Sequence, residues 1–298
     1  MDIQTYLQEK KGIIDLALEG YLPKEGEFTG TLHRAIRYSL FASGKRIRPI
    51  LAIAAYEAAG GCGDVVLPFA CAIEMIHTYS LIHDDLPSMD NDDYRRGKPT
   101  CHKVFGEAIA ILAGDALLTE AFNLMTKQHL SDSECKDGPL LLNLVNEVAW
   151  AAGLSGMVAG QVVDIESEGK EVDLPTLEYL HTHKTGKMIL ASIRVGARLG
   201  EADNEMLKRI TRYGERIGLA FQIADDILNV EGKAEKLGKS IGTDRLKKKA
   251  TYPSLLGLEE SKRRATELVQ LALDALSPFG PEANPLREIA AFIVKRDY

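Results

Sequence analysis

The run IHTYSLIHDDLPSMD, residues 76–90, organises the chain because it places three carboxylates at the end of an apolar, helix-forming segment. Asp84 and Asp85 are adjacent, and Asp90 follows six residues after Asp84. A helix predicted from about residue 64 to residue 83 delivers this cluster at its C-terminal end, where Pro87 stops the helix.

A second pair of carboxylates, Asp225 and Asp226, lies in the run FQIADDILN, residues 221–229, again within a helical pattern. Adjacent carboxylates repel each other unless a cation lies between them. Sets of carboxylate oxygens suit Mg²⁺, which takes few protein ligands and completes its shell with water and phosphate oxygens. The two clusters together predict one magnesium site and chemistry on a diphosphate.

Most of the remaining chain is expected to be helical, since apolar residues recur at helical spacing and strand-type alternation is nearly absent. The further helices that we expect cover residues 2–20, about 31–41, 50–59, 105–129, 176–199, 204–230, 252–258, 260–276 and 286–294, with more helix between the loops at 131–139 and 168–175. No repeat period, low-complexity tract or interdomain linker appears between them. We therefore predict an all-α fold, one domain over residues 1–298 with roughly ten to thirteen helices.

Composition and charge narrow the class of protein. The net charge of −7 argues against a general nucleic-acid binder, which would show a basic excess. No cysteine belongs to a CxxC pair, so reduced thiols fit better than a zinc site or disulfides for Cys62, Cys71, Cys101 and Cys135. The N-terminus lacks a signal-peptide pattern, and no segment approaches about 18 consecutive apolar residues. We expect a cytoplasmic protein without a membrane span.

Helical spacing places several polar side chains on shared faces, because residues three, four or seven apart project from the same side. On the first helix His77 and Ser80 share a face with Leu81 and Asp84. Amide and carboxylate side chains are paired in the same way at Gln222 with Asp225 and Asp226, and at Gln161 with Asp164. Each pair alone is better explained by an ordinary hydrogen bond, at the surface or buried, but together they can line one polar cavity between helices.

Basic residues gather near glycines, prolines and expected helix ends, where side chains can converge on phosphate: Lys45, Arg46, Arg48, Arg95, Arg96, Lys184 and Lys239. Arg95 and Arg96 follow the Asp cluster closely, and a guanidinium can bind phosphate through two hydrogen bonds. The lysines at 247–249 have no such neighbour and are expected to face solvent. The run GKS at 238–240 resembles the end of a P-loop, but the required earlier glycine and the preceding strand are absent, which argues against ATP hydrolysis.

Taken in order, these motifs resemble those of the trans-prenyl diphosphate synthases, and most closely the short-chain bacterial type that makes farnesyl diphosphate. The resemblance covers almost the whole chain, with GKRIRP at 44–49, IHTYSLIHDDLPSMDNDDYRRGKPT at 76–100, GQVVD at 160–164, HKTGKM at 183–188, FQIADDILNV at 221–230, LGKS at 237–240 and TYPSLLG at 251–257. It implies an isoprenoid-synthase-type helical bundle around a deep central cavity, a homodimer, and two Asp clusters that face each other across the cavity.

The resemblance also implies roles for individual residues. The ligands of about three Mg²⁺ ions would be Asp84, Asp85, Asp90 and Asp225. The allylic diphosphate would be bound by Arg95, Lys184 and Lys239. Isopentenyl diphosphate would be bound through its own diphosphate by Lys45, Arg48, His77 and Arg96, with Gly44 also among the substrate-binding residues. Lys184, Thr185 and Gln222 would both bind substrate and join the Asp84 cluster as catalytic residues.

The implied reaction needs no protein nucleophile. Metal ions and basic side chains stabilise the charge on the departing pyrophosphate, so the allylic C–O bond can ionise. The double bond of isopentenyl diphosphate then attacks the carbocation, and a proton is lost to the released pyrophosphate. Dimethylallyl and geranyl diphosphate would be extended to farnesyl diphosphate, or alternatively the product would be the longer geranylgeranyl diphosphate.

Two positions bear on the product and on the metal. Tyr79, next to Ser80, precedes Asp84 by five residues, about 7.5 Å along a helix. In similar enzymes a bulky residue here closes the bottom of the product pocket, although Tyr79 can equally be a core aromatic. Asn229 takes the place of a third carboxylate in the second cluster, and we leave it out of the ligand set because an amide brings no charge.

Three other classes of protein stay open at this point. A terpene cyclase would have no use for a second diphosphate site. A metal phosphohydrolase would use His83 with Asp84 and the nearby His77. A helical partner subunit would modulate another prenyl synthase, which the two intact Asp clusters argue against.

Overall fold

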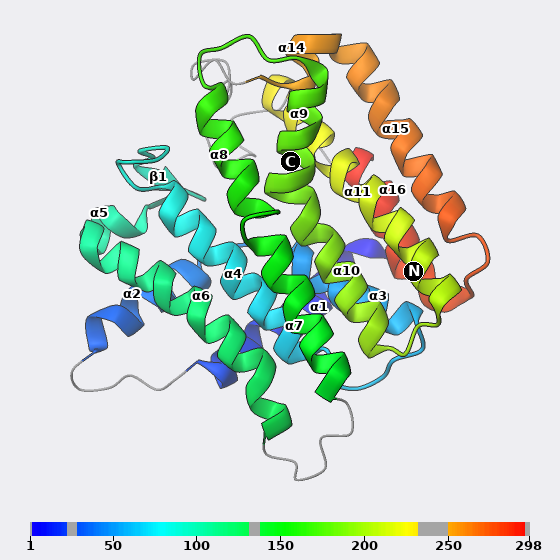
Figure 1. The fold of residues 1–298 in the computed structure, drawn as a ribbon, viewed down its shortest axis with the longest axis horizontal. Helices are drawn as coiled ribbons and strands as arrows, with labels where there is room; N and C mark the ends of the chain where they lie inside the picture. Colours follow the sequence, from blue (N-terminus) through cyan, green and yellow to red (C-terminus); the bar gives the residue numbers. More distant parts are fainter. Residues whose placement is uncertain (1, 23–28, 131–137, 232–249, 296–298) are drawn as a thin grey trace. The chain divides into compact units, whose positions relative to one another are not determined.

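The computed structural model describes residues 2–22, 29–130, 138–231 and 250–295, and within these ranges the chain is all-α apart from one short hairpin (Figure 1). The described ranges contain fourteen α-helices, somewhat more than expected. The short helix α5 was not predicted, and the helix expected over 176–199 is interrupted by a π-helical turn. The all-α prediction is confirmed.

The helices follow the sequence closely. In the first half they are α1 (Ile3–Tyr21), α2 (Gly30–Leu40), α3 (Ile47–Ala58), α4 (Leu67–Asp84), α5 (Cys101–Phe105), α6 (Glu107–Leu130) and α7 (Gly138–Ala152). In the second half they are α8 (Met157–Ser167), α9 (Leu174–His181), the π-helical turn η1 (Thr182–Gly186), α10 (Lys187–Leu199), α11 (Asn204–Glu231), α14 (Tyr252–Leu256), α15 (Leu258–Ala275), the 3₁₀ turn η2 (Pro281–Ala283) and α16 (Asn284–Lys295). The antiparallel hairpin consists of β1 (Tyr94–Arg95) and β2 (Lys98–Pro99).

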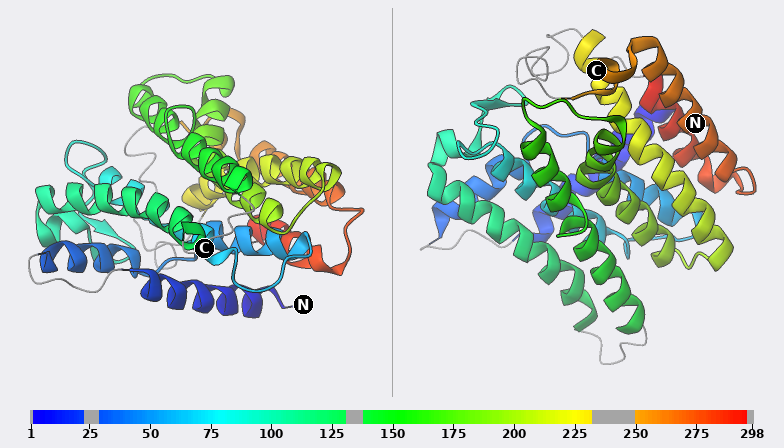
Figure 2. Two further views of the ribbon diagram at one scale, coloured as in Figure 1. Left: turned by 60° about the horizontal axis from the view of Figure 1, so that its bottom comes forward. Right: turned by 45° about the horizontal axis from the view of Figure 1, so that its top comes forward.

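The chain divides into two compact units. One unit comprises Leu7–Ile50 and Leu67–Val145. Its central helix is α4, which is buried along almost its whole length and packs along α6. Figure 2 shows α4 and α6 running side by side in both views. This unit, called the first unit below, contains the first Asp cluster.

The other unit comprises Met1–Tyr6, Leu51–Val66 and Asn146–Tyr298, and it is called the second unit below. Its long helix α11 packs against α10, α15 and α16. The buried Tyr213 of α11 ties these helices together, because its hydroxyl donates a hydrogen bond to the carbonyl of Leu286 in α16 at 2.7 Å. This unit contains the second Asp cluster.

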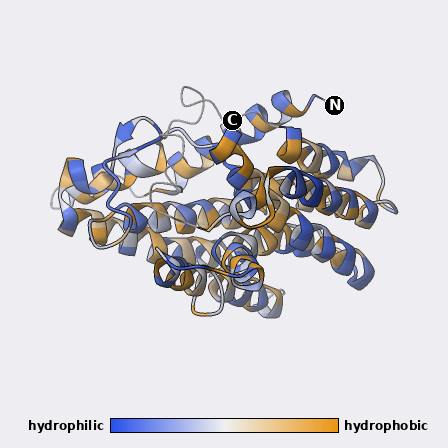
Figure 3. Ribbon diagram, turned by 90° about the horizontal axis from the view of Figure 1, so that it is seen from above, coloured by the Kyte–Doolittle hydropathy of each residue, from blue (hydrophilic) through white to orange (hydrophobic). Residues whose placement is uncertain are grey.

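Amphipathic sequence explains why these helices pack. Figure 3 shows hydrophobic and hydrophilic residues on the same helices, so each can bury one side. Two stretches, Glu107–Lys127 and Gly138–Ser167, are long and apolar enough to cross a membrane by length and composition. Core helices of soluble proteins meet the same criterion, so these two stretches are weak evidence for a membrane span.

Candidate active site

The first Asp cluster is shaped by the end of α4. The helix ends at Asp84, and the backbone N–H of Asp90 donates to the carbonyl of Asp84 at 2.8 Å. The turn between them therefore returns Asp90 to the helix end. Asp85 is only 3% exposed, whereas Asp84 and Asp90 are partly exposed. Two of the three carboxylates thus have access to solvent, which a ligand of an exchangeable metal requires.

The buried carboxylate of Asp85 is bound by Arg95 from the hairpin. Arg95 Nε lies 2.7 and 2.9 Å from the two oxygens of Asp85, and Arg95 Nη2 lies 2.5 Å from Oδ1. Burial alone would lower the pKa of Arg95, but the Asp85 carboxylate outweighs it and raises the pKa. The guanidinium is therefore a fixed cation beside the carboxylates.

The next residue, Arg96, turns to a different part of the same unit. Its backbone has φ of 53°, in the left-handed region, and Gly97 follows with φ of 77°. A Cβ added to Gly44 would lie 2.6 Å from Nη1 of Arg96, so the guanidinium rests against the glycine. Gly44, predicted to bind substrate, therefore provides the space for a cation that could do so.

His77 is surrounded by cations. Burial lowers its pKa well below the ordinary value, and the charges of Arg48, Arg96, Arg95 and Arg46 lower it further. His77 is consequently a neutral imidazole at neutral pH, able to donate one hydrogen bond without adding charge. Arg48 and Arg96, which we expect to bind isopentenyl diphosphate together with His77 and Lys45, both act on the charge of His77. Their shared role stays a prediction.

His83 does not support the phosphohydrolase alternative. Its Nε2 lies 3.1 Å from the carbonyl oxygen of Ile111 in α6, and a Cβ added to Gly114 would come within 2.2 Å of this nitrogen. The imidazole is therefore packed against α6.

Tyr79 is 8% exposed and meets the ring of His83 edge to face, with 5.7 Å between ring centroids. Burial and the charge of Asp84 raise the pKa of Tyr79.

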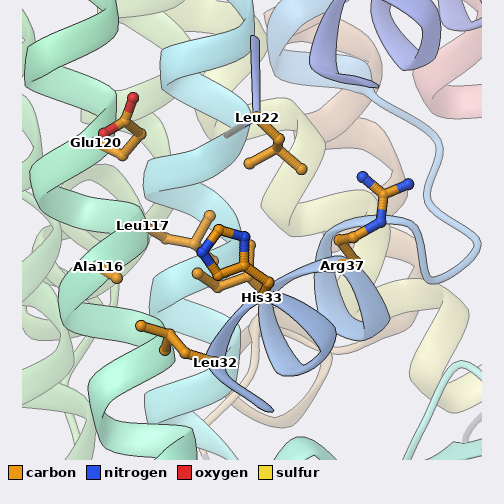
Figure 4. Close-up of a pocket in the computed structure, with 8 residues that line it drawn as sticks. Leu22, Leu32, His33, Arg37, Ala116, Leu117 and Glu120 are labelled. Atoms are coloured by element: carbon orange, nitrogen blue, oxygen red, sulfur yellow. The ribbon is translucent and has the colours of Figure 1, made fainter. Parts of the chain in front are cut away.

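Two cavities lie in the first unit. A small one of about 40 Å³ adjoins the Asp85 and Arg95 pair and is also lined by Arg96 and Thr78. Another of about 130 Å³ lies between α2 and α6 (Figure 4). Its Arg37 is bound to both oxygens of Glu19 at 2.7 and 2.6 Å, so this largely apolar cavity is not arranged to bind a diphosphate.

The second Asp pair is held differently. Asp226 is 4% exposed, and its Oδ2 lies 2.9 Å from His181 Nε2 and accepts a 2.9 Å hydrogen bond from the backbone N–H of Tyr252. Asp225 and Gln222 on the same helix are partly exposed. Asp226 is thus a buried carboxylate with two hydrogen-bond partners, and Asp225 as the metal ligand of this pair stays a prediction.

Lys184 and Thr185 lie in the π-helical turn η1, which fits tightly against its neighbours. A Cβ on Gly160 would come within 2.1 Å of the backbone nitrogen of Lys184, so the glycine lets α8 approach this turn. Lys184 Nζ is 2.6 Å from Asp164 Oδ2. Gly160 and Asp164, the first and last residues of the GQVVD motif, therefore both contact this turn. The buried Oε1 of Gln161 has no hydrogen-bond partner among the described residues.

Sequence reasoning missed His181 and the burial of Arg46. The capping box at Thr251 and Ser254, which fixes the position of Tyr252, follows a recognisable sequence pattern, but His181 follows none.

Some predicted positions, Lys239, the lysines at 247–249 and Cys135, lie outside the described residues. The other cysteines are free thiols, as expected. No group of three or more His, Cys, Asp or Glu side chains among the described residues is arranged to hold a metal ion.

The site therefore combines carboxylates, arginines and a neutral histidine on an all-α scaffold, which defines an all-α protein with a charged site that suits anions. The polyprenyl synthetase family model matches residues 29–276. The chain is 48% identical to the farnesyl diphosphate synthase of Geobacillus stearothermophilus, over 100% of this chain and 99% of that protein. It is 49% identical to a geranylgeranyl diphosphate synthase of Cyanophora paradoxa, over 99% and 97% of the two chains.

The fold is also similar to that of a solved synthase structure. The apo crystal structure of an FPP/GFPP synthase from Zymomonas mobilis superposes with a TM-score of 0.86 at 39% identity, over 98% of each chain. The chain belongs to the polyprenyl synthetase family, and it is accordingly a prenyltransferase of isoprenoid biosynthesis.

Proposed function

We propose that this prenyltransferase condenses isopentenyl diphosphate with dimethylallyl and then geranyl diphosphate, giving farnesyl diphosphate and pyrophosphate. One observation carries the proposal: the adjacent Arg95 and Arg96, which both line the small cavity beside Asp85, contact different groups. Arg95 binds Asp85 at the end of α4, whereas Arg96 rests against Gly44. Two anion-binding places in one unit suit an enzyme that holds two diphosphates, and a terpene cyclase would need only one.

The first place would hold the allylic diphosphate. Mg²⁺ prefers oxygen ligands and needs only one or two carboxylates besides water and phosphate, so one or two of Asp84, Asp85 and Asp90 would be enough to hold it. Asp225 would be the ligand from the second cluster. When bound, Mg²⁺ would offset the negative charge that develops on the leaving pyrophosphate. Arg95, Lys184 and Lys239 would hold the phosphate oxygens as hydrogen-bond donors.

The second place would hold isopentenyl diphosphate through Lys45, Arg48, His77 and Arg96. His77 lies seven residues before Asp84, two turns along the same helix face, which is a rise of about 10.5 Å. This spacing suits two substrates bound side by side. The oxygens of Thr185 and Gln222 would stabilise the allylic cation after its C–O bond breaks. The homoallylic double bond then forms the new C–C bond, and the proton leaves to pyrophosphate.

Farnesyl diphosphate is the product that we propose, since several relatives with that name match along their full length. Tyr79, beside Ser80, would close the pocket below Asp84. Tyr79→Ala should shift the product toward the geranylgeranyl length, with Tyr94→Ala as the control, because Tyr94 is an exposed tyrosine of the hairpin. An unchanged farnesyl product from Tyr79→Ala would refute this role.

The main test is direct. Purified protein is incubated with Mg²⁺, isopentenyl diphosphate and each allylic diphosphate in turn, and the dephosphorylated products are identified by chain length. Farnesol from dimethylallyl and geranyl substrates is expected. Absence of condensation with every pair would refute the proposal. Phosphate release without condensation would favour a phosphohydrolase, and activity only after addition of another synthase would favour a partner subunit.

We further propose one domain over residues 1–298, a homodimer and a cytoplasmic location. Exposed apolar side chains on α8 support the dimer, because Val158, Val162 and Ile165 follow each other at helical spacing with 43%, 48% and 45% of their surface exposed. Light scattering should give twice the chain mass of 32.7 kDa. A monomeric mass at working concentration would reject the dimer.

A further inference from the structure

Arg46 differs from its neighbours in the GKRIRP motif. Lys45 is exposed and Arg48 is partly exposed, but Arg46 is only 3% exposed. Its backbone has φ of 54°, a left-handed conformation that a residue with a side chain keeps only where its surroundings impose it. The chain thus turns Arg46 fully inward, whereas Lys45 is exposed and Arg48 is partly buried.

Three segments hold the guanidinium of Arg46. Its Nε donates to Asp15 Oδ1 in α1 at 2.8 Å, and its Nη1 donates to Glu74 Oε1 in α4 at 2.7 Å. Its Nη2 donates to the carbonyl of Leu40 at the end of α2 at 2.6 Å. Every nitrogen of the side chain has a partner, and the acceptors come from three different helices. The orientation of Arg46 is therefore fixed.

This ion network lies directly beside the proposed subsite for isopentenyl diphosphate. Glu74 is three residues before His77, so the two side chains share a face of α4. A Cβ on Gly44 would lie 3.4 Å from Nη1 of Arg46 and 2.6 Å from Nη1 of Arg96. Gly44 thus lies close to both the buried guanidinium of Arg46 and the guanidinium of Arg96, which is proposed to contact substrate.

The carboxylates of the network also offset the repulsion between neighbouring cations. The subsite collects several cations, which repel one another. Burial lowers the pKa of Arg96 and the charge of Arg46 lowers it further, but Glu74 acts in the opposite direction. Burial also opposes the charge of Arg46, yet Glu74 and Asp15 outweigh it and raise the pKa of Arg46. The carboxylates therefore hold the cations together before any diphosphate arrives.

We propose that Arg46 is a positioning residue for isopentenyl diphosphate, acting through Lys45, Arg48 and Arg96 while Glu74 and Asp15 hold it in place. The inference rests on the proposed function, because it assumes that these three side chains bind that diphosphate. A role in stability alone is the competing explanation. Buried ion pairs contribute little net stability against apolar replacements of similar size, which allows the two roles to be separated.

The experiment compares Arg46→Met, Arg46→Lys and the double variant Arg46→Met/Glu74→Met. Arg46→Met leaves Glu74 as a buried, unpaired charge and should lower the melting temperature, whereas the double variant removes both charges and should recover it. In the double variant and in Arg46→Lys, the KM for isopentenyl diphosphate should rise about tenfold or more, because small displacements of binding groups have large effects. The KM for geranyl diphosphate should stay within about twofold of wild type.

Calorimetric titration with isopentenyl diphosphate alone should show the same loss of affinity. Arg37→Met is the control, because Arg37 also pairs with a carboxylate, Glu19, but both side chains are about half exposed at 45% and 46%. A double variant with recovered stability and a wild-type KM for isopentenyl diphosphate would overturn the inference. If the double variant does not fold, Arg46→Lys decides by the same comparison. A wild-type protein that forms no product would instead refute the proposed function.

Discussion

The two carboxylate pairs look alike in the sequence, and each unit treats its pair by the same general plan. One member is buried and bound by protein groups, Asp85 in the first unit and Asp226 in the second. The other member, Asp84 or Asp225, is partly exposed. An adjacent pair of aspartates in these helices is therefore not a pair of equal ligands.

The partners of the buried members differ, and the difference separates two roles. Asp85 is bound by Arg95, a cation that is itself proposed to bind phosphate, so the pair can exchange partners when a diphosphate arrives. Asp226 is bound by His181 and by the backbone N–H of Tyr252, and neither group has a proposed contact with substrate. Asp85 is therefore proposed to belong to the reacting site, whereas Asp226 of α11 links His181 of α9 to Tyr252 of α14.

The largest expected effect comes from removing the exposed members. Asp84→Ala and Asp225→Ala should each lower turnover by about 10²-fold or more, because metal-bound charge contributes several kcal/mol to the transition state. Turnover is measured at saturating substrates over a range of Mg²⁺ concentrations. Melting temperatures should stay close to wild type, since both side chains are partly exposed.

The control for these variants is Asp115→Ala. Asp115 lies on α6 with its side chain 60% exposed and 3.9 Å from His83. Its removal should leave turnover unchanged. Near-normal turnover of Asp84→Ala would exclude that carboxylate as an essential ligand and would remove the distinction between the exposed and buried members.

A smaller effect, on stability, is expected within the second pair. Asp226→Asn keeps the size of the side chain but replaces charged hydrogen bonds with neutral ones, which should lower the free energy of unfolding by about 1–2 kcal/mol. Asp225→Asn should not lower it. Urea unfolding followed by circular dichroism measures both. Equal stability of the two variants would mean that the contacts with His181 and Tyr252 do not distinguish Asp226 from its neighbour.

The helices and the two Asp clusters could be predicted because each is encoded by the spacing of residues that are close in sequence. Apolar spacing located α11 and α4 to within a few residues, and charge spacing identified Asp84, Asp85 and Asp225 as candidates. The choice of Asp225 over Asp226 came from family resemblance, since helical spacing alone treats them alike. The structure distinguishes the two by burial and contacts, because Asp226 accepts a hydrogen bond from the backbone N–H of Tyr252, 26 residues further along the chain.

Contacts between distant segments explain what could not be predicted. Arg46 was grouped with Lys45 and Arg48 as three similar cations, but Glu74 and Asp15, 28 and 31 residues away, bury it. No periodicity encodes such pairings. The π-helical turn at Lys184 likewise lies in close contact with Gly160, 24 residues earlier in the chain. Positioning groups are therefore harder to find in a sequence than the ligands that they position.

The smallest effect is expected at the far end of the second cluster, where the two clusters differ in sequence. Asn229 lies one turn after Asp225 on α11. The third carboxylate of the first cluster, Asp90, lies instead in the turn that follows α4. Asn229→Asp adds a partly exposed charge, so the Mg²⁺ concentration for half-maximal turnover should fall by less than about fivefold, equivalent to about 1 kcal/mol. Asp90→Asn should raise the same concentration by more than this. A tenfold or larger fall for Asn229→Asp would show that position 229 can act as a direct metal ligand, and the two clusters would then be more alike than their surroundings indicate.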